Sequence, residues 1–464
     1  MKSRNAGRAV IGALAVGSLV LAAGCSSSKK AAGSATSSSA APSSAAAPSA
    51  AASTAAASTA ATAPSTTSAA PASSAASDEK VTITFWHSYS ADSEVPTLDK
   101  VVIPAFEALH PNITVKEVAF SHDDLYQKLL TGSAAGELPD VVRSDIAWTP
   151  TFAKSGVFAP LDTTMSDFQS LADQTFPGNL STNLYQGHYY GLPLDTNTRV
   201  MYSNPAAFAA AGISSPPKTF ADMLADAPKL KAKGIYLYGD GGTGGWNVLP
   251  WIWSAGGSLT NADNTKATGY INSAQSVAAV QMLTTLYKEG AIPNIMLGAQ
   301  GGLSTSDGVP KGKYAMTLDG PWMNPIWAGS YPNFKPQEDL VPAGPGGSIS
   351  VVGGEDINMV ASTKHKDAVA QFISYMLSSD AQLAMTKVGQ LSVRKDLQSQ
   401  LTAIQPYYAT FLTQLATAKA RTPVPNYPQI DQIINTQVAN AMSGKETPQK
   451  AMDEAAAQID PLLK

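Results

Sequence analysis

The spacing of apolar residues divides the chain into three parts. Residues 9–23 form an apolar run of about fifteen residues that follows the basic residues Lys2, Arg4 and Arg8. Residues 26–77 are almost entirely Ser, Ala, Thr and Pro, without an aromatic residue or an apolar period, so they are predicted to form a disordered tether. Apolar residues recur with helical and strand periods only after Asp78, where the folded part is expected to begin.

Strands and helices are predicted to alternate through the folded part. Val81–Trp86 alternates as a strand does, Leu98–His110 has a helical period that Pro111 ends, and Ile113–Phe120 is a second strand. Further strands are expected at 140–144, 201–204 and 313–318, and further helices at 123–136, 146–156, 220–233, 273–289, 367–388 (one or two helices), 429–443 and from 447. This order favours an α/β architecture with largely parallel sheets, and the length favours two lobes.

Cys25 is the only cysteine and directly follows the N-terminal apolar run. A basic start and an apolar run too short to span a membrane are typical of an export signal. The sequence "LAAGC" resembles a bacterial lipoprotein signal, which implies a signal peptide at 1–25 and acyl chains such as palmitate on Cys25. An ordinary secretory signal is the alternative. A single cysteine also excludes an intramolecular disulfide and a cysteine-rich metal site.

The charge of the folded part argues against anionic partners. All 35 acidic residues follow Ser77, whereas five of the 31 basic residues precede it, which leaves a formal charge of −9 on the folded part. An acidic domain without a basic run is a poor candidate for binding nucleic acid or anionic lipid.

No motif of catalysis, metal binding or cofactor binding is found. The five histidines (His87, His110, His122, His188 and His365) are too scattered to form a local ligand pair. Nucleophile-elbow, phosphate-loop and dinucleotide motifs are absent from the sequence. Ser215 and Lys218 have the spacing of a serine–lysine pair, but both residues between them are prolines, which do not suit a nucleophile inside a helix. We therefore expect a protein that is not an enzyme and that holds no metal or cofactor.

Many of the seven tryptophans stand beside small, amide or acidic residues, as in "SDIAW", "GGWNVLPWIWSAGG" and "LDGPWMNPIW". A sugar has an apolar face that stacks on such rings and hydroxyl groups that need carboxylate, amide or guanidinium partners. Trp86, Trp251 and Trp327 are predicted to pack in the core, because a strand-end or helix-interior ring more often packs than binds.

Six segments in order carry a resemblance to a known family. They are "ITFWHSYS", "LPDVVRSDIAWTPTFAKSGVFAPLD", "YGLPLDTNTRVMYSN", "GKYAMTLDGPW", "VVGGEDINM" and "FISYMLSSDAQ". From Val81 to the C-terminus the chain resembles extracellular solute-binding proteins of the carbohydrate-transporter class, related to maltose-binding proteins.

The resemblance implies a two-lobed periplasmic-binding-protein (Venus-flytrap) fold whose lobes are discontinuous in sequence and close about a hinge. The N-terminal lobe would comprise 78–195 and 353–397, and the C-terminal lobe 196–352 and 398–464. The chain would cross between them near Pro193–Asn197, Ser350–Gly354 and Ser392–Leu397. Pro193 and the pair Gly353 and Gly354 suit hinges, which absorb changes in backbone torsion.

The resemblance also implies which residues would bind ligand in the cleft. They are His87, Ser88, Tyr89, Asp145, Trp148, Asp195, Asn197, Trp246, Asn247, Trp253, Trp322, Glu355 and Asp356. Asp145 is supported independently, because ligands bind at the C-terminal ends of strands in open α/β sheets. Asp195 has an alternative role as a hinge ion pair with Arg199, and Asp356 as a turn cap.

The sequence thus predicts a monomeric, lipid-anchored receptor on the extracellular face of the cell membrane that delivers a sugar or short oligosaccharide to an ABC permease. The stretch "VVRSDIAW" departs from maltose binders, so the identity of the sugar is left open. A polyol or glycerophosphodiester is the alternative ligand, although the acidic balance and the few basic cleft candidates weigh against an anion. A surface-anchored adhesin or enzyme is the alternative from another class.

Overall fold

The computed structural model describes residues 79–91, 93–298 and 302–464. The predicted signal peptide, Cys25 and the predicted tether lie outside the described residues. None of the helices in the described ranges is both long and apolar enough to cross a membrane.

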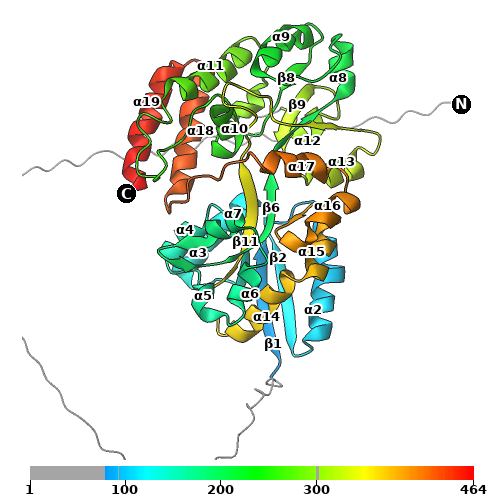
Figure 1. Cartoon of the computed structure of the whole chain (residues 1–464), viewed down its shortest axis with the longest axis vertical. Coiled ribbons are helices and arrows are strands. Elements are labelled where there is room, and N and C mark those ends of the chain that lie inside the picture. Colours follow the sequence, from blue (N-terminus) through cyan, green and yellow to red (C-terminus); the bar gives the residue numbers. More distant parts are fainter. Residues whose placement is uncertain (1–78, 92, 299–301) are drawn as a thin grey trace, which may run out of the picture. The chain divides into compact units, whose positions relative to one another are not determined.

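The first lobe is built on a six-stranded sheet in the order β12-β6-β11-β3-β1-β2 (Figure 1, lower part). Its strands are β1 (Val81–His87), β2 (Ile113–Ala119), β3 (Val141–Asp145), β6 (Leu192–Thr198), β11 (Val352–Met359) and β12 (Leu391–Ser392). Its helices are α1 (Glu94–Thr97), the π-helix Leu98–Val102, α2 (Ile103–Leu109), α3 (His122–Ala135), α4 (Thr149–Lys154), α5 (Leu161–Thr164), α6 (Phe168–Ala172), α7 (Pro177–Leu180), α14 (Lys366–Met376) and α15 (Ser379–Thr386). A short hairpin joins β4 (Leu184–Tyr185) to β5 (His188–Tyr189).

The second lobe is built on a four-stranded sheet in the order β10-β7-β9-β8 (Figure 1, upper part). Its strands are β7 (Val200–Ser203), β8 (Tyr236–Tyr238), β9 (Tyr314–Asp319) and β10 (Gln337–Asp339). Its helices are α8 (Pro205–Ala210), α9 (Phe220–Lys231), α10 (Gly245–Ser254), α11 (Ala274–Lys288), α12 (Thr305–Gly308), α13 (Met323–Ser330), α18 (Tyr427–Ser443) and α19 (Pro448–Ile459).

Both sheets are mixed, so the prediction of largely parallel sheets is wrong. β1 pairs in parallel with β2 and β3, and β8 with β9, whereas β11 is antiparallel to β3 and β6, β12 to β6, and β7 to β9 and β10. The reason lies in the route of the chain between the lobes. β6 carries the chain out of the first sheet and β11 brings it back, so these neighbours run in opposite directions.

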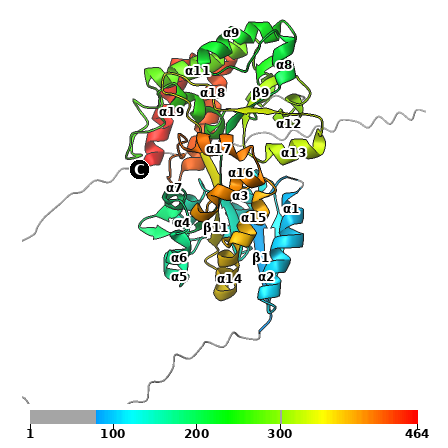
Figure 2. The ribbon, with the colours of Figure 1, turned by 45° about the vertical axis from the view of Figure 1, so that its right-hand side comes forward.

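The chain changes sheet at three places that lie close together. Arg199 alone separates β6 from β7, and Val351 precedes β11. The third passage runs through α16 (Gln398–Ile404) and α17 (Tyr408–Leu415), which Figures 1 and 2 show leading from the lower lobe to the upper. Lys419 then pairs in parallel with Val351, so the third passage lies beside the second. The exact lobe boundaries stay a prediction.

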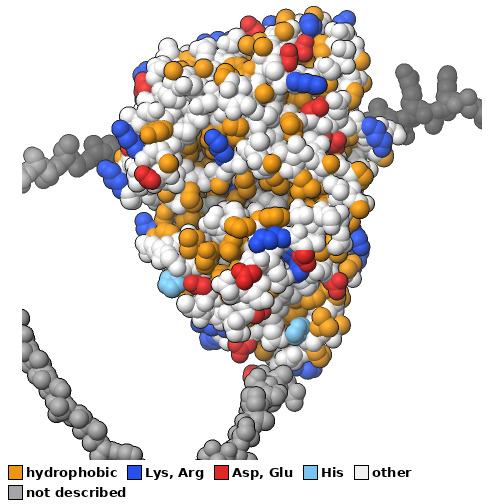
Figure 3. Space-filling view, in the orientation of Figure 1, with side chains coloured by type: hydrophobic (Ala, Val, Ile, Leu, Met, Phe, Trp, Pro, Cys, Tyr) orange, Lys and Arg blue, Asp and Glu red, His pale blue; other side chains and the backbone are white. Residues whose placement is uncertain are grey.

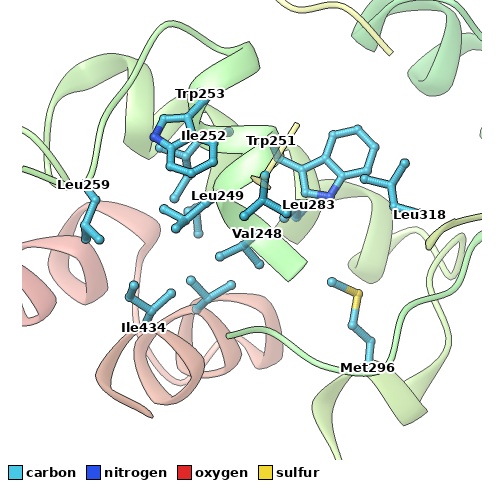
Figure 4. Close-up of a cluster of buried hydrophobic side chains, with 14 of the residues drawn as sticks. Val248, Leu249, Trp251, Ile252, Trp253, Leu259, Leu283, Met296, Leu318 and Ile434 are labelled. Carbon is cyan, nitrogen blue, oxygen red and sulfur yellow. The ribbon is translucent and has the colours of Figure 1, made fainter. Parts of the chain in front are cut away.

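The core of the second lobe forms around α10. Its sequence "GWNVLPWIWS" buries Val248, Leu249, Trp251 and Ile252 among side chains of α11 and α18 (Figure 4). Two of the three tryptophans predicted to be core are confirmed, because Trp251 and Trp327 are fully buried in hydrophobic clusters. The third, Trp86, is partly buried against the ring of Phe120.

Candidate ligand-binding cleft

A cavity of about 690 Å³ opens between the two lobes. On the face shown in Figure 3, apolar side chains gather at mid-height, where the two lobes meet, with acidic and basic side chains close by. Seven of the residues predicted to bind ligand line the cavity: Ser88, Asp145, Trp148, Asn197, Trp246, Trp322 and Glu355. This volume lies in the range typical of small-molecule sites.

Three carboxylates stand in one row across the first sheet. Glu355 on β11 is in register with Asp145 on β3 and with Asp195 on β6. Like charges directly opposite one another destabilise a sheet, so the row needs a cation. Arg143, two residues before Asp145 on the same strand, lies on the same face, because side chains alternate between the faces of a strand.

Arg143 supplies that cation. Its Nε donates to Asp195 Oδ2 at 3.0 Å and its Nη2 to Glu355 Oε2 at 2.7 Å. Its guanidinium lies 4.1 Å from the centre of the Tyr89 ring. Burial raises the pKa of Glu355 well above its ordinary value, although Arg143 opposes this. Burial alone would lower the pKa of Arg143, but Asp195 and Glu355 outweigh it, so the guanidinium stays charged.

A second guanidinium, that of Arg421, reaches the row from the segment between α17 and α18. Its Nη2 donates to Asp145 Oδ1 at 2.6 Å, while His122 Nε2 lies 3.3 Å from Asp145 Oδ2. Burial favours a raised pKa for Asp145, but Arg421 and His122 together hold it well below its ordinary value. Burial likewise favours a lowered pKa for His122, but hydrogen bonds to Asp123 and Asp145 raise it to about 9.

Aromatic rings line the cavity from both lobes. Trp246, the second residue of α10, stacks on Trp322, with ring centres 6.4 Å apart and planes 26° apart. From the first lobe, Trp148 packs against His122 and Tyr126 at ring separations of 4.6 and 5.1 Å. Gly353 has no room for a side chain, because a Cβ there would meet the Trp246 ring at 2.7 Å. Glycine at this position therefore lets the Trp246 ring approach the start of β11.

His87, the last residue of β1, and Tyr89, in the loop after it, lie behind the cavity wall rather than on it. His87 is fully buried, and its Nε2 lies 2.7 Å from Glu117 Oε2. Burial, with Arg143 as a second cause, lowers the pKa of His87 to about 3, so the ring is neutral. Tyr89 is buried beneath Arg143. The prediction that these side chains line the cleft is wrong, because His87 pairs with Glu117 and packs on the Tyr89 ring, and the Tyr89 ring lies against Arg143.

Asp195 and Asn247 bind neighbouring side chains of the protein. The predicted ion pair between Asp195 and Arg199 is wrong, since Asp195 pairs with Arg143, and Arg199 pairs with Asp240 at 2.8 Å. Asn247 donates to the same Asp240 at 2.6 Å. Neither Asp195 nor Asn247 is part of the cavity lining.

Asp356 and Trp253 also lie away from the cavity. Asp356 follows Glu355 and therefore faces the other side of the sheet, where Thr149 Oγ1 and Asn183 Nδ2 donate to it at 2.9 and 2.7 Å. The predicted turn-capping role is wrong as well, because Asp356 lies inside β11. Trp253 is packed in the core of the second lobe (Figure 4).

Several lining residues were not predicted: Ser90, Glu94, His122, Tyr126, Arg143, Gln390, Arg421, Tyr427 and Asp431. Arg143 had a signal in the sequence, since a lone cation within the apolar strand "DVVRS" is unusual unless paired. Arg421 had none, because its segment has no period. The assumption of few basic cleft residues is wrong, yet both guanidinium groups are held by carboxylates. Among the residues that the structure describes, no cluster of His, Cys, Asp and Glu is suited to a metal ion.

The sequence profile of the bacterial extracellular solute-binding proteins matches residues 91–383. The chain belongs to this family. It is 29% identical over 375 residues to a putative binding protein of Brucella abortus, covering 78% of this chain and 88% of that protein. It is 27% identical over 421 residues to the sn-glycerol-3-phosphate-binding periplasmic protein UgpB of Escherichia coli K12. That match covers 82% of this chain and 92% of UgpB.

Solved structures of the family confirm the fold. A solute-binding protein of an ABC transporter from Thermotoga lettingae, bound with α-D-tagatose, superposes with a TM-score of 0.74 at 28% identity. The match covers 83% of this chain and 100% of the Thermotoga lettingae protein. The GacH receptor of Streptomyces glaucescens, solved unliganded and with acarbose, has a TM-score of 0.74 at 25% identity, covering 83% and 98%. The two-lobed fold predicted for this member of the family is therefore confirmed.

We predict that Asp356→Asn makes stability less dependent on pH. Burial raises the pKa of Asp356 from its ordinary value of 3.8 to about 8. Because the folded state binds the Asp356 proton more tightly than the unfolded state does, protonation of Asp356 stabilises the fold. This contribution to the unfolding free energy is complete below about pH 4 and is lost as the pH rises through 8. The unfolding free energy of the unmodified protein, from urea titrations, should thus fall from pH 5 to pH 8 relative to that of Asp356→Asn.

Asp367→Asn is the matched control, because Asp367 is an exposed carboxylate in the first turn of α14. Its effect should be a few tenths of a kcal/mol and equal at both pH values. Parallel pH profiles for Asp356→Asn and the unmodified protein would contradict the prediction.

Proposed function

We propose that the protein captures a sugar or short oligosaccharide in the cleft between its lobes and delivers it to an ABC permease. The observation that supports this most is the combination of Trp148, Trp246 and Trp322 with carboxyl and amide side chains, such as Glu355, Asp431 and Asn197, in one cavity. The apolar face of a sugar ring stacks on an indole, and its hydroxyl groups donate to carboxylate and amide oxygens.

A buried acceptor without a partner belongs to one of the residues that line the cavity. Asn197 lines the cavity with 4% of its surface exposed, and its Oδ1 has no hydrogen-bond partner within the described part of the chain. An unpaired buried polar atom is unfavourable by about 1–3 kcal/mol, so a ligand hydroxyl that pairs with it gains correspondingly. An epimer that leaves the atom unpaired loses that gain, which is how such a site distinguishes sugars.

Ligand capture is proposed to close the lobes about β6 and β11. A ligand favours the closed form only by the difference between its affinities for the closed and open forms, so contacts from both lobes are needed. Glu355 and Trp148 belong to the first lobe, and Trp246 and Trp322 to the second. Gly354, with a φ of 135°, adopts a backbone conformation suited to glycine at the start of β11.

The anchor is proposed from the sequence. An acylated Cys25, followed by the tether at 26–77, would hold the receptor at the extracellular face of the membrane, where two acyl chains are enough for stable anchoring. Labelling cells with a palmitate analogue should mark the protein, and Cys25→Ala should abolish the label and release the protein into the medium. Label retained on Cys25→Ala would contradict the lipoprotein assignment.

A phosphorylated polyol is the second candidate, favoured by the relationship to the glycerol-3-phosphate-binding protein. The paired state of Arg143 and Arg421 weighs against it, because a phosphate binds most strongly where guanidinium groups are free. A panel of mono-, di- and oligosaccharides, polyols and glycerol 3-phosphate, monitored by tryptophan fluorescence and melting temperature, separates the two. A saturable response to one sugar supports the proposal, and a response to glycerol 3-phosphate alone rejects it.

We predict that Trp322→Ala weakens sugar binding far more than it lowers stability. Trp322 is partly exposed on the cavity wall, so its removal takes away a stacking face worth on the order of 1–3 kcal/mol, roughly 5- to 150-fold in Kd. Calorimetric titration and urea unfolding measure the two effects.

Trp327→Ala is the matched control five residues later. Trp327 is buried against Tyr202 and Phe334, so its removal should lower the unfolding free energy by about 3–5 kcal/mol. If Trp322→Ala lost comparable stability without losing affinity, Trp322 would be a packing residue.

A further inference from the structure

The two guanidinium groups at the cavity are neutralised in different ways. Arg143 is enclosed within the first lobe by Asp195 and Glu355. Arg421 is ion-paired with Asp145 alone, across the two lobes, and its Nε has no hydrogen-bond partner within residues 79–91, 93–298 and 302–464. Arg421 is nevertheless 9% exposed in its side chain and lines the cavity. Within the described residues, Asp145 is therefore the one carboxylate that forms an ion pair with Arg421, and loss of its charge would leave the Arg421 guanidinium without an ion-pair partner in the cleft.

Asp145 has little capacity left for a ligand. Its Oδ1 accepts from Arg421 at 2.6 Å and from the Ala147 backbone N–H at 2.7 Å. Its Oδ2 lies 3.3 Å from His122 Nε2. Since both oxygens are engaged, the main effect of this side chain at the cavity is electrostatic.

We propose that Asp145 determines the charge selectivity of the cleft: by holding Arg421 it restricts the site to uncharged ligands, and without its charge Arg421 becomes a binding group for phosphate-bearing solutes. This inference rests on the proposed capture of a neutral sugar. It identifies one residue by which a sugar-binding cleft of this shape is kept from binding a phosphorylated polyol.

The electrostatic reason follows from burial. Arginine binds phosphate through paired N–H groups, which are in part occupied by Asp145. A phosphate that displaced Asp145 would leave an uncompensated carboxylate, with 12% of its side chain exposed, beside the newly bound anion. Asp123, whose pKa is lowered by its hydrogen bond to His122, also lines the cavity and would repel the anion further. Asn at position 145 removes this carboxylate and keeps an oxygen for the Ala147 N–H.

The test compares inorganic phosphate, glycerol 3-phosphate and glycerol on the full-length protein by calorimetric titration. Asp145→Asn should bind glycerol 3-phosphate at least tenfold more tightly than the unmodified protein does, with no gain for glycerol. The double variant Asp145→Asn with Arg421→Gln should lose the gain, because the guanidinium is absent. A gain that survives in the double variant assigns the phosphate to another group, such as His122, and overturns the proposal.

Asp123→Asn is the matched control, because Asp123 also lines the cavity and contacts His122 but not Arg421. It removes the same charge and should not bring a tenfold gain. An equal gain would show that net charge, rather than release of Arg421, sets the selectivity. If Asp145→Asn does not fold, as judged by circular dichroism, Asp145→Ser replaces it, since serine is neutral and also accepts from the Ala147 N–H.

Sugar binding of the unmodified protein, measured in parallel, keeps the two proposals apart. A phosphate gain in Asp145→Asn without any sugar response supports the role of Asp145 and rejects the sugar. A sugar response of the unmodified protein, without a phosphate gain in Asp145→Asn or Asp145→Ser, supports the sugar and rejects the role of Asp145. Binding of glycerol 3-phosphate by the unmodified protein as tightly as by Asp145→Asn overturns the selectivity role.

Discussion

The buried cation of Arg143 is the interaction on which the site and the hinge both depend. It lies on β3 and binds Asp195 on β6 and Glu355 on β11, so it joins three adjacent strands of the first sheet. Two of these strands are the ones by which the chain leaves and re-enters the first lobe. Removing one partner of a buried ion pair is unfavourable by about 3–5 kcal/mol, so the charged side chains of these three strands depend on one another. The binding groups are thus built on the elements about which the lobes are proposed to close.

The second lobe contributes a different kind of surface to the same cavity. Trp246 lies in the first turn of α10 and Trp322 directly precedes α13, and both rings line the cavity. Flat apolar faces and hydrogen-bond acceptors complement the two kinds of surface that a sugar ring has. Because both lobes contribute groups to the same cavity, a ligand that contacts both would favour the closed form, which explains physically why affinity and closure would be coupled.

Local sequence patterns predicted most helices and strands. They did not predict the relative directions of the strands or which side chains point into the cavity. The 367–388 stretch was expected to be one or two helices and is two, because Ser378 caps the start of α15. Strand direction depends on pairing between segments more than 150 residues apart, such as Thr198 and Val352, which no local period encodes. Trp253 was misplaced for a similar reason. It lies seven residues after Trp246, about 10 Å farther along α10, where the helix has already entered the core.

Shape alone does not define which solute a cavity of about 690 Å³ accepts, since sugars, polyols and their phosphate esters have similar dimensions. Apolar stacking faces discriminate weakly among such molecules, because an added or missing group changes the stacked area little. Buried charged groups discriminate strongly, since each one that a ligand leaves unpaired is unfavourable. In this cleft both guanidinium groups of the described lining, those of Arg143 and Arg421, already have a carboxylate partner. The Oδ1 atom of Asn197, in contrast, has no hydrogen-bond partner among the described residues. The pairing of charges before the ligand arrives therefore favours a ligand that brings hydroxyl donors and no charge of its own.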